Sequence, residues 1–342
     1  MDKKKTDKMH ILVTGGCGFI GSNFVRYMLS RHPHAITNMD KLTYAGNLEN
    51  LKGLESEPRY RFIKGDISNI SDVERAFADN IDIVVNFAAE SHVDRSILDP
   101  GAFIGTNIHG TYLLLETARK KGVTKFMQVS TDEVYGSLPP AGKFTEGTPL
   151  APNSPYSASK ASADLLAIAY CKTFKTPVVI TRCSNNYGPY QFPEKLIPLL
   201  ITNAIENLEL PIYGDGQNVR DWIHVEDHCE AIALVLEKGE TGNIYNVGAE
   251  NERTNLEIVT LILDILKKPH SLIKYVKDRP GHDRRYAIDN TKIQTKLGFK
   301  PRRDFKTGLE ETVQWYAENR TWWESIRTGE YLKYYEKMYK DR

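Results

Sequence analysis

The sequence predicts an α/β fold in which a doubly wound parallel sheet is joined by a smaller, partly interleaved α/β domain. Short apolar runs alternate with longer helical stretches through residues 10–182, which is typical of strands linked by helical crossovers. The early runs are almost continuously apolar, as expected for parallel strands covered by helices on both faces. A glycine-rich turn also joins the first of these runs to the first helical stretch.

The elements of the first half follow from hydrophobic periodicity. Helical stretches are expected at 19–30, 71–78, 105–121 and 157–174. Candidate strands are the apolar, β-rich runs at 10–13, 35–39, 60–64, 83–86, 125–130 and 177–182.

Beyond residue 184 the alternation loosens, because prolines and the turn Gly214-Asp215-Gly216 interrupt it. A helix at 225–237 and a strand at 244–247 are expected to return to the main sheet, and two more helices are expected at 255–267 and 306–319. The first domain is therefore predicted to comprise residues 8–184 and about 219–248. The second is predicted to comprise about 185–218 and 249–342.

Charge and composition restrict the class of protein. The 342 residues hold 45 Lys and Arg against 44 Asp and Glu, so no global field favours nucleic acid or an anionic membrane as a partner. Apolar runs such as 81–89 are too short to span a membrane, and the basic N-terminus lacks the apolar stretch of a signal peptide. The four cysteines form no CxxC pair, which is typical of reduced thiols, and a cytoplasmic location is expected.

The turn after the first predicted strand carries glycines at positions 15, 18 and 21. These allow a tight turn, close approach of a pyrophosphate, and close packing of helix on strand, which is the Rossmann pattern for a dinucleotide. Asp40 lies near the spacing expected for a carboxylate that binds the ribose hydroxyls, and its charge favours NAD over NADP. The alternative is a turn aspartate beside a structural loop. The predicted cofactor-binding residues are Gly15, Gly18, Phe19, Ile20, Gly21, Asp40, Lys41, Asp66, Ile67, Ala88, Ala89, Tyr156 and Lys160.

Tyr156 and Lys160 belong to the segment Tyr-Ser-Ala-Ser-Lys, which places a phenol and an ammonium on one face of a predicted helix. A nearby ammonium lowers the pKa of a phenol, which ordinarily lies near 10. Such a tyrosine can take the proton of a sugar hydroxyl while hydride leaves the same carbon. A surface tyrosine and lysine are the alternative for an isolated motif of this kind.

The fifth predicted strand runs into Thr131, Asp132 and Glu133. A hydroxyl and two adjacent carboxylates at a strand end are candidate hydrogen-bonding, acid and base groups. A solvated acidic turn is the competing interpretation.

Taken together and in order, these motifs resemble the extended short-chain dehydrogenases that act on nucleotide sugars. The resemblance covers nearly the whole chain and includes the glycine turn, Asp40, the segments 130–136 and 156–160, Asn-Asn-Tyr-Gly-Pro at 185–189, and 220–227. Within that family, the Thr-Asp-Glu triplet is most similar to that of the dTDP-glucose 4,6-dehydratases. Asp132 is the residue that distinguishes this triplet from that of the related UDP-glucuronate decarboxylases.

The resemblance implies a reaction in which dTDP-glucose becomes dTDP-4-keto-6-deoxyglucose and water. Tyr156 would deprotonate the C4 hydroxyl as hydride passes to NAD, with Thr131 and Lys160 in support. Glu133 would remove the C5 proton and Asp132 would protonate the departing C6 hydroxyl. Hydride would then return to C6. The division of roles between the two acids is a hypothesis.

The resemblance also implies the remaining ligand contacts. The predicted substrate-binding residues are Ser91, Thr131, Asn185, Glu194, Lys195, Tyr213, Arg220 and Arg279. The helices at 105–121 and 157–174 would pair with those of a second copy into a four-helix bundle, giving a homodimer. His224 and His282 are interpreted as structural, and no metal-binding motif is found, so no catalytic metal is expected.

Three other functions stay open. A UDP-sugar 4-epimerase generally lacks the adjacent acids, and a UDP-glucuronate decarboxylase usually carries serine in place of Asp132. A non-catalytic NAD-sensing scaffold would not need the catalytic residues Thr131, Tyr156 and Lys160, all of which this chain retains.

Overall fold

The computed structural model describes residues 8–278 and 281–327. It divides into two compact units, each formed from three separate stretches of chain. Unit 1 comprises residues up to Thr131, Ser154–Arg182 and Cys229–Tyr245. Unit 2 comprises Asp132–Asn153, Cys183–His228 and the residues from Asn246 onward.

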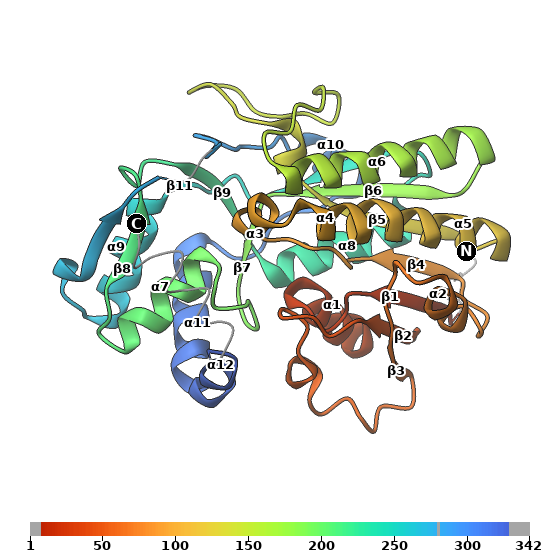
Figure 1. Cartoon of the computed structure of the whole chain (residues 1–342), viewed down its shortest axis with the longest axis horizontal. Helices are drawn as coiled ribbons and strands as arrows, with labels where there is room; N and C mark the ends of the chain where they lie inside the picture. Colours follow the sequence, from red (N-terminus) through yellow and green to blue (C-terminus); the bar gives the residue numbers. More distant parts are fainter. Residues whose placement is uncertain (1–7, 279–280, 328–342) are drawn as a thin grey trace. The chain divides into compact units, whose positions relative to one another are not determined.

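Unit 1 is built on a seven-stranded sheet with the order β10-β6-β5-β4-β1-β2-β3 (Figure 1). The pairs from β5 through β4, β1 and β2 to β3 are all parallel. Central β1 is buried from Ile11 to Thr14, so its continuous apolar run reflects covering on both faces. The strands are β1 (His10–Thr14), β2 (Ala35–Asp40), β3 (Tyr60–Lys64), β4 (Ile83–Asn86), β5 (Lys125–Thr131), β6 (Val178–Cys183) and β10 (Ile244–Val247).

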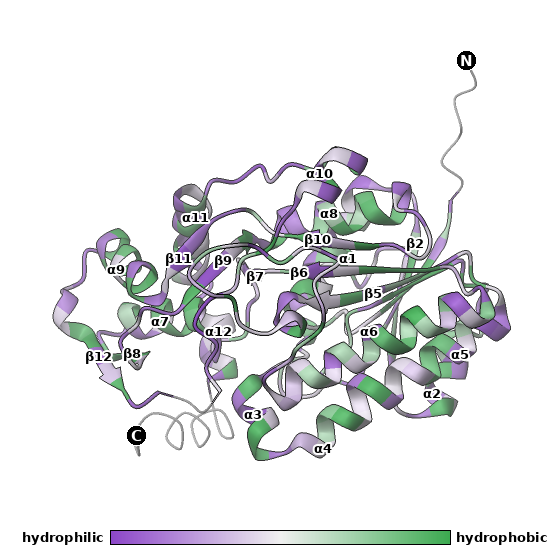
Figure 2. Cartoon of the chain, turned by 90° about the horizontal axis from the view of Figure 1, so that it is seen from above, coloured by the Kyte–Doolittle hydropathy of each residue, from purple (hydrophilic) through white to green (hydrophobic). Residues whose placement is uncertain are grey.

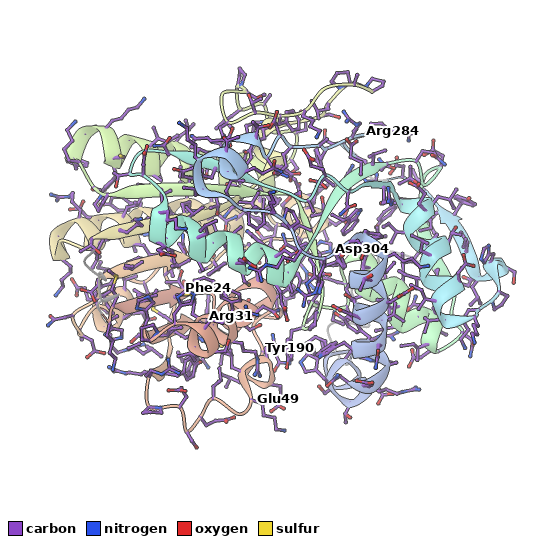
Figure 3. All side chains as sticks on the ribbon, turned by 180° about the vertical axis from the view of Figure 1, so that it is seen from behind. Phe24, Arg31, Glu49, Tyr190, Arg284 and Asp304 are labelled. Carbon is purple, nitrogen blue, oxygen red and sulfur yellow. The ribbon has the colours of Figure 1, made fainter. Side chains whose placement is uncertain are left out.

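Helices cover this sheet. Those of unit 1 are α1 (Phe19–Arg31), α2 (Ile70–Ala76), α3 (Val93–Leu98), α4 (Pro100–Phe103), the π-helical η2 (Ile104–Gly110), α5 (Thr111–Lys121) and α6 (Pro155–Phe174), and α8 (Val225–Lys238) crosses from unit 2 into unit 1. Helices α5 and α6 lie side by side (Figure 1). On α1, Phe24 is fully buried and its ring centroid lies 5.2 Å from that of Phe87, whereas Arg31 marks the helix end (Figure 3).

Unit 2 holds two small sheets, of order β11-β9-β7 and β12-β8. Its strands are β7 (Asn185–Tyr187), β8 (Leu210–Tyr213), β9 (Val219–His224), β11 (Glu252–Thr254) and β12 (Ile273–Val276). Its helices are α7 (Leu196–Ile205), α9 (Asn255–Leu266), α10 (Thr291–Leu297), α11 (Phe305–Glu318) and α12 (Arg320–Ile326). Short 3-10 turns complete the chain: η1 (Leu48–Leu51), η3 (Asp132–Tyr135) and η4 (His270–Leu272).

The core of unit 2 is rich in aromatic side chains. Trp323 is fully buried and its indole N–H donates to the carbonyl of Tyr316 over 2.8 Å. Tyr190, labelled in Figure 3, packs edge-on against Trp315 and Trp322, with ring centroids 4.8 and 5.9 Å away. Its φ of 68° places a non-glycine residue in the left-handed region.

The predicted fold class is confirmed, and every strand and helix predicted from periodicity is present to within a few residues. The elements that were not predicted are short, such as β7, β11 and α4, or lie in the segment interrupted by prolines. The stretches 132–153 and 219–228, which the sequence analysis placed with the first domain, fall in unit 2. The ligand assigned to each domain stays a prediction.

One surface of unit 1 exposes large apolar side chains. Figure 2 shows hydrophobic segments along α3, α4, α5 and α6. The exposed residues on these elements and on η2 are Ile97, Leu98, Ile104, Tyr112, Leu165 and Phe174. Leu114, by contrast, packs inside the core of unit 1. Across the part of the chain that the structure describes, no helix combines the length and the apolar character needed to cross a membrane.

Candidate functional site

The glycine turn of unit 1 has the geometry that a dinucleotide requires. Gly15 has φ +72°, and a Cβ there would lie 2.6 Å from the backbone nitrogen of Ala88, so glycine alone fits. At Gly21 a Cβ would lie 2.3 Å from the carbonyl oxygen of Gly15. A Cβ built on Gly18 would have, apart from its chain neighbours, one atom within 4 Å: the carbonyl oxygen of Gly15, at 3.3 Å. The turn therefore packs tightly at its base and is open at its middle glycine, where a pyrophosphate would approach the start of α1.

Asp40 ends β2 and holds this turn in place. One carboxylate oxygen accepts the backbone N–H of Cys17 over 2.9 Å, and the other accepts that of Leu42 over 2.8 Å. Burial raises the pKa of Asp40, and these two hydrogen bonds oppose the rise. A carboxylate oxygen can accept more than one hydrogen bond, so Asp40 retains the capacity to bind ribose hydroxyls.

Other predicted cofactor contacts gather at the same edge of the sheet. Lys41 forms an ion pair with Asp66 over 2.7 Å. Burial alone would raise the pKa of Asp66, but hydrogen bonds from Lys41 and Ser68 lower it. The charge of Lys41 is thus matched by a carboxylate in the same unit. Ile67 is buried, and Ala88 and Ala89 follow the end of β4.

Thr131, Tyr156 and Lys160 are brought into unit 1 on two adjoining elements. Tyr156 and Lys160 lie one turn apart on α6, which Ser154 and Ser157 start with a reciprocal capping box. The Lys160 ammonium donates to the carbonyl oxygen of Val129 on β5 over 2.8 Å. Because Thr131 ends that strand, this bond ties the helix to the strand that carries the predicted hydroxyl.

A buried ion pair of unit 1, between Asp164 and Arg182, was not predicted. Asp164 lies one turn beyond Lys160 on α6, and Arg182 lies near the end of β6. The guanidinium Nε donates to the Asp164 carboxylate over 2.8 Å, and both side chains are buried. The spacing of four residues from Tyr156 to Lys160 to Asp164 was the available sequence signal.

Asp132 and Glu133 begin unit 2 in the 3-10 turn that follows β5. Asp132 is 1% exposed and Glu133 is half-buried, so the solvated acidic turn is excluded for Asp132. Sequence analysis missed Tyr286, whose phenol donates to the carboxylate of Asp283. Burial raises the pKa of Tyr286 above its usual value, and the neighbouring Glu133 carboxylate raises it further.

Arg220 is held rigidly in unit 2. Its guanidinium donates to the backbone carbonyls of Val219 over 2.7 Å and Asp283 over 2.9 Å. Its Cζ lies 4.2 Å from the centre of the Tyr286 ring, which is cation–π geometry. Arg220 is thereby oriented before any ligand arrives.

The other predicted substrate contacts are spread over several elements. Lys195 occupies the N-cap position of α7, and Glu194, just before it, is buried. Asn185 starts β7, Tyr213 ends β8, and Ser91 lies half-buried between β4 and α3 in unit 1. Arg279 lies outside the described residues. The structure thus places Ser91, Thr131, Tyr156 and Lys160 with the glycine turn in unit 1, and the other described catalytic and substrate-binding candidates in unit 2.

The two histidines interpreted as structural occupy different settings. His224 is buried on β9, and burial lowers its pKa to about 3. His282 lies next to Asp278, with Nδ1 2.6 Å from a carboxylate oxygen. Within residues 8–278 and 281–327, no group of three or more His, Cys, Asp or Glu side chains is arranged to hold a metal ion.

Comparisons with known proteins agree with this arrangement. A family model described as GDP-mannose 4,6 dehydratase matches residues 12–312. A dTDP-glucose 4,6-dehydratase of Actinoplanes sp. is 51% identical over 321 residues, covering 92% of this chain and all of the relative.

Two solved structures define the structural likeness. The dTDP-glucose 4,6-dehydratase of Streptomyces venezuelae, solved with NAD and TYD bound, is 51% identical with a TM-score of 0.91, covering 93% of this chain and 100% of its own. A UDP-glucose 4-epimerase of Thermus thermophilus, in complex with NAD, is 31% identical with a TM-score of 0.85, covering 91% and 100%.

Proposed function

We propose that this chain, which belongs to the GDP-mannose 4,6 dehydratase family, is an NAD-dependent dTDP-glucose 4,6-dehydratase. It converts dTDP-glucose to dTDP-4-keto-6-deoxyglucose and water. The observation that carries this proposal is the buried Asp132 beside Glu133, directly after the strand that ends in Thr131. The function is also that of relatives about half identical over nearly the full chain.

The residues of unit 1 fit NAD. The glycine turn leaves the middle glycine open, and Asp40 presents a carboxylate at the end of β2. Gly15, Gly18, Phe19, Ile20 and Gly21 form the phosphate-binding turn and the start of α1, with Lys41, Asp66, Ile67, Ala88 and Ala89 around it. When bound, NAD supplies an acceptor for the C4 hydride and returns that hydride to C6.

In the first step, Tyr156 takes the proton of the C4 hydroxyl as the hydride leaves C4. Tyr156 enters this step as a phenolate, whose charge Lys160 stabilises and to whose oxygen Thr131 donates a hydrogen bond. It leaves the step as a neutral phenol. The C4 ketone that forms makes the neighbouring C5 proton acidic. The proton moves in the same step as the hydride, so neither charge accumulates on the sugar.

Elimination follows at C5 and C6. Glu133 removes the C5 proton, and Asp132 donates a proton to the C6 hydroxyl as the C6–O bond breaks and water leaves. After hydride returns to C6, Glu133 gives its proton back to C5. Tyr156 then holds the proton taken from the C4 hydroxyl and Asp132 lacks the proton given to water, so the transfer of one proton from Tyr156 to Asp132 by way of solvent returns the protein to its starting state.

The nucleotide diphosphate is bound by residues of unit 2. Arg220 is oriented by two carbonyls and the Tyr286 ring, which suits a planar fork that meets phosphate oxygens. The other residues assigned to the substrate are Asn185, Glu194, Lys195, Tyr213 and Arg279, together with Ser91 and Thr131.

A homodimer in the cytoplasm is part of the proposal. Tyr112 and Leu165 project from α5 and α6 with 39% and 57% of their surface exposed, and a second copy would cover them in a four-helix bundle. Replacing Leu165 with Glu would place a charge in that interface and is expected to give a monomer in analytical ultracentrifugation. A Leu208→Glu control, at an exposed apolar residue of unit 2, should leave the mass unchanged.

The test uses dTDP-glucose carrying deuterium at C4, in ordinary water and without added reductant. The dehydratase reaction predicts loss of one water with the deuterium recovered at C6. In heavy water with unlabelled substrate, one solvent deuteron should appear at C5. An Asp132→Asn variant should still oxidise C4 but should eliminate water more slowly, because the leaving hydroxyl then lacks its acid.

Other products would refute the assignment. An unchanged mass with inverted C4 from UDP-glucose would identify an epimerase, and loss of carbon dioxide from UDP-glucuronate would identify a decarboxylase. A chain that binds NAD but changes none of the three sugars would be a cofactor-sensing scaffold.

A further inference from the structure

The face of α6 that carries Tyr156 and Lys160 continues one turn further. Asp164 follows Lys160 by four residues, as Lys160 follows Tyr156, so the three side chains share one stripe of the helix. They are 8%, 5% and 0% exposed in that order. The stripe therefore runs from Tyr156, which is slightly exposed, to Asp164, which is fully buried inside unit 1.

Asp164 is one of three buried charged groups at this point. Arg182 contacts its carboxylate over 2.8 Å, and a guanidinium keeps its proton even when buried. Burial raises the pKa of Asp164, and the charges of Arg182 and Lys160 oppose that rise. Neutralising one partner of a buried ion pair is costly. The contact with Arg182 therefore favours the aspartate anion.

Asp164 also adjoins the strand that bears Thr131. The side chain of Ser130, the residue just before Thr131, opposes the rise that burial causes in the pKa of Asp164. Lys160 is fixed to the same strand through the carbonyl of Val129. A single carboxylate is thus coupled to the ammonium and to the strand end on which the proposed chemistry depends.

The neighbouring elements carry other charges. Asp94 and Arg95 lie on α3 and Glu116 and Arg119 lie on α5, and both helices pack against α6. Glu116 is bound by Arg119 over 2.7 Å and receives the Tyr170 hydroxyl at 3.2 Å. That acid therefore meets α6 more than three turns beyond Tyr156.

We propose that Asp164, paired with Arg182, is a positioning residue that holds Lys160 in its ammonium form, and that it thereby supports Tyr156 as the proton acceptor. This role rests on the proposed function of Tyr156 in hydride transfer. Asp164 does not touch the substrate, so its effect is exerted through the charge and orientation of Lys160.

The first experiment measures Lys160 itself. Protein carrying NAD and lysine labelled with ¹³C at Cε is titrated by NMR, and the Lys160 signal is assigned by its absence from Lys160→Met. Asp164→Asn removes the anion, so the pH midpoint of Lys160 is expected to fall by about one unit or more. Asp164→Glu keeps the charge and should restore the midpoint. Glu116→Gln, which breaks an acid–arginine pair on the neighbouring helix, should leave it unchanged.

A second variant guards against misfolding. Asp164→Asn leaves Arg182 without its partner, so Asp164→Asn/Arg182→Met removes both charges. Asp164 lies a single turn from Lys160 on the same helix, so the double variant should still lower the midpoint, by less than the single change. An unchanged Lys160 midpoint in the double variant would overturn the proposal, whether or not the single variant folds.

The second readout is the pH dependence of dTDP-glucose dehydration. In Asp164→Asn, kcat should decline at lower pH on the alkaline side than in the wild type, while KM stays the same. Profiles that superimpose after scaling would assign Asp164 a structural role alone. If the wild type does not dehydrate dTDP-glucose, the proposed function has failed, and the NMR titration still decides the role of Asp164.

Discussion

Two buried tyrosines, one in each unit, have opposite neighbours. Tyr156 lies on α6 one turn before the Lys160 ammonium. Tyr286 lies beside the Glu133 carboxylate, and its hydroxyl donates to Asp283. Burial raises the pKa of Tyr286, and the adjacent carboxylates raise it further. The same phenol is therefore proposed to accept a proton in unit 1 and remains a hydrogen-bond donor in unit 2, where the carboxylates of Glu133 and Asp283 outweigh the nearby Arg220 cation.

The largest expected effect separates these two tyrosines directly. Tyr156→Phe should lower kcat for dehydration by about 10²- to 10⁴-fold, the usual contribution of a general acid or base. Tyr286→Phe should stay within about tenfold of wild type, because it loses one hydrogen bond and keeps the ring beneath Arg220. Both rates are measured by product mass at saturating substrate. A loss at Tyr286 as large as that at Tyr156 would break the comparison.

The next effect is a loss of folding stability at low pH. Burial lowers the pKa of His224 and of His228 to about 3, and His228 Nδ1 donates to the Asn186 side chain over 2.8 Å. In the unfolded chain these rings take up protons below about pH 6.5. The folded form binds those protons only near pH 3. Stability is thus lost as the pH falls through this window, by on the order of 3 kcal/mol for each ring at about pH 4.

Hydrogen exchange is the measurement that locates this loss. Between neutral pH and about pH 4, after correction for intrinsic exchange, the amides of β7 and β9 should lose protection before those of β4 and β5. A His228→Gln variant should show a flatter dependence of unfolding free energy on pH than the wild type. Equal loss of protection in both units would remove this difference between them.

The smallest expected effect tests whether the Tyr286 ring orients Arg220. Relative to Tyr286→Phe, Tyr286→Ala also removes the aromatic face that lies 4.2 Å from the Arg220 guanidinium. Such a contact contributes about 1 kcal/mol, so KM for dTDP-glucose should rise roughly fivefold while kcat differs little between the two variants. Isothermal titration with dTDP provides the binding measurement. Equal KM values for the two variants would show that the ring does not orient Arg220.

Local sequence signals predicted the elements of unit 1 well. The apolar run of β1 and the glycines at 15, 18 and 21 report on neighbouring residues, so their pattern predicts strand, turn and helix without the rest of the chain. The i,i+4 spacing of Tyr156 and Lys160 likewise predicts a shared helix face. Unit 2 was predicted less well, because β7 and β11 have only three residues each, and because prolines interrupt the pattern before β8 and β9.

The sequence by itself determined the α/β class and the dinucleotide turn, because each depends on residue type and local spacing. The reacting side chains stay a prediction. Only the tertiary structure decided which charges meet. The pairing of Asp164 with Arg182, of Lys41 with Asp66, and of Glu133 with Tyr286 joins residues from different elements. Chain folding brings such groups together in a low-dielectric interior, where proximity and burial set their protonation. The periodicity of the sequence does not predict which distant groups become neighbours.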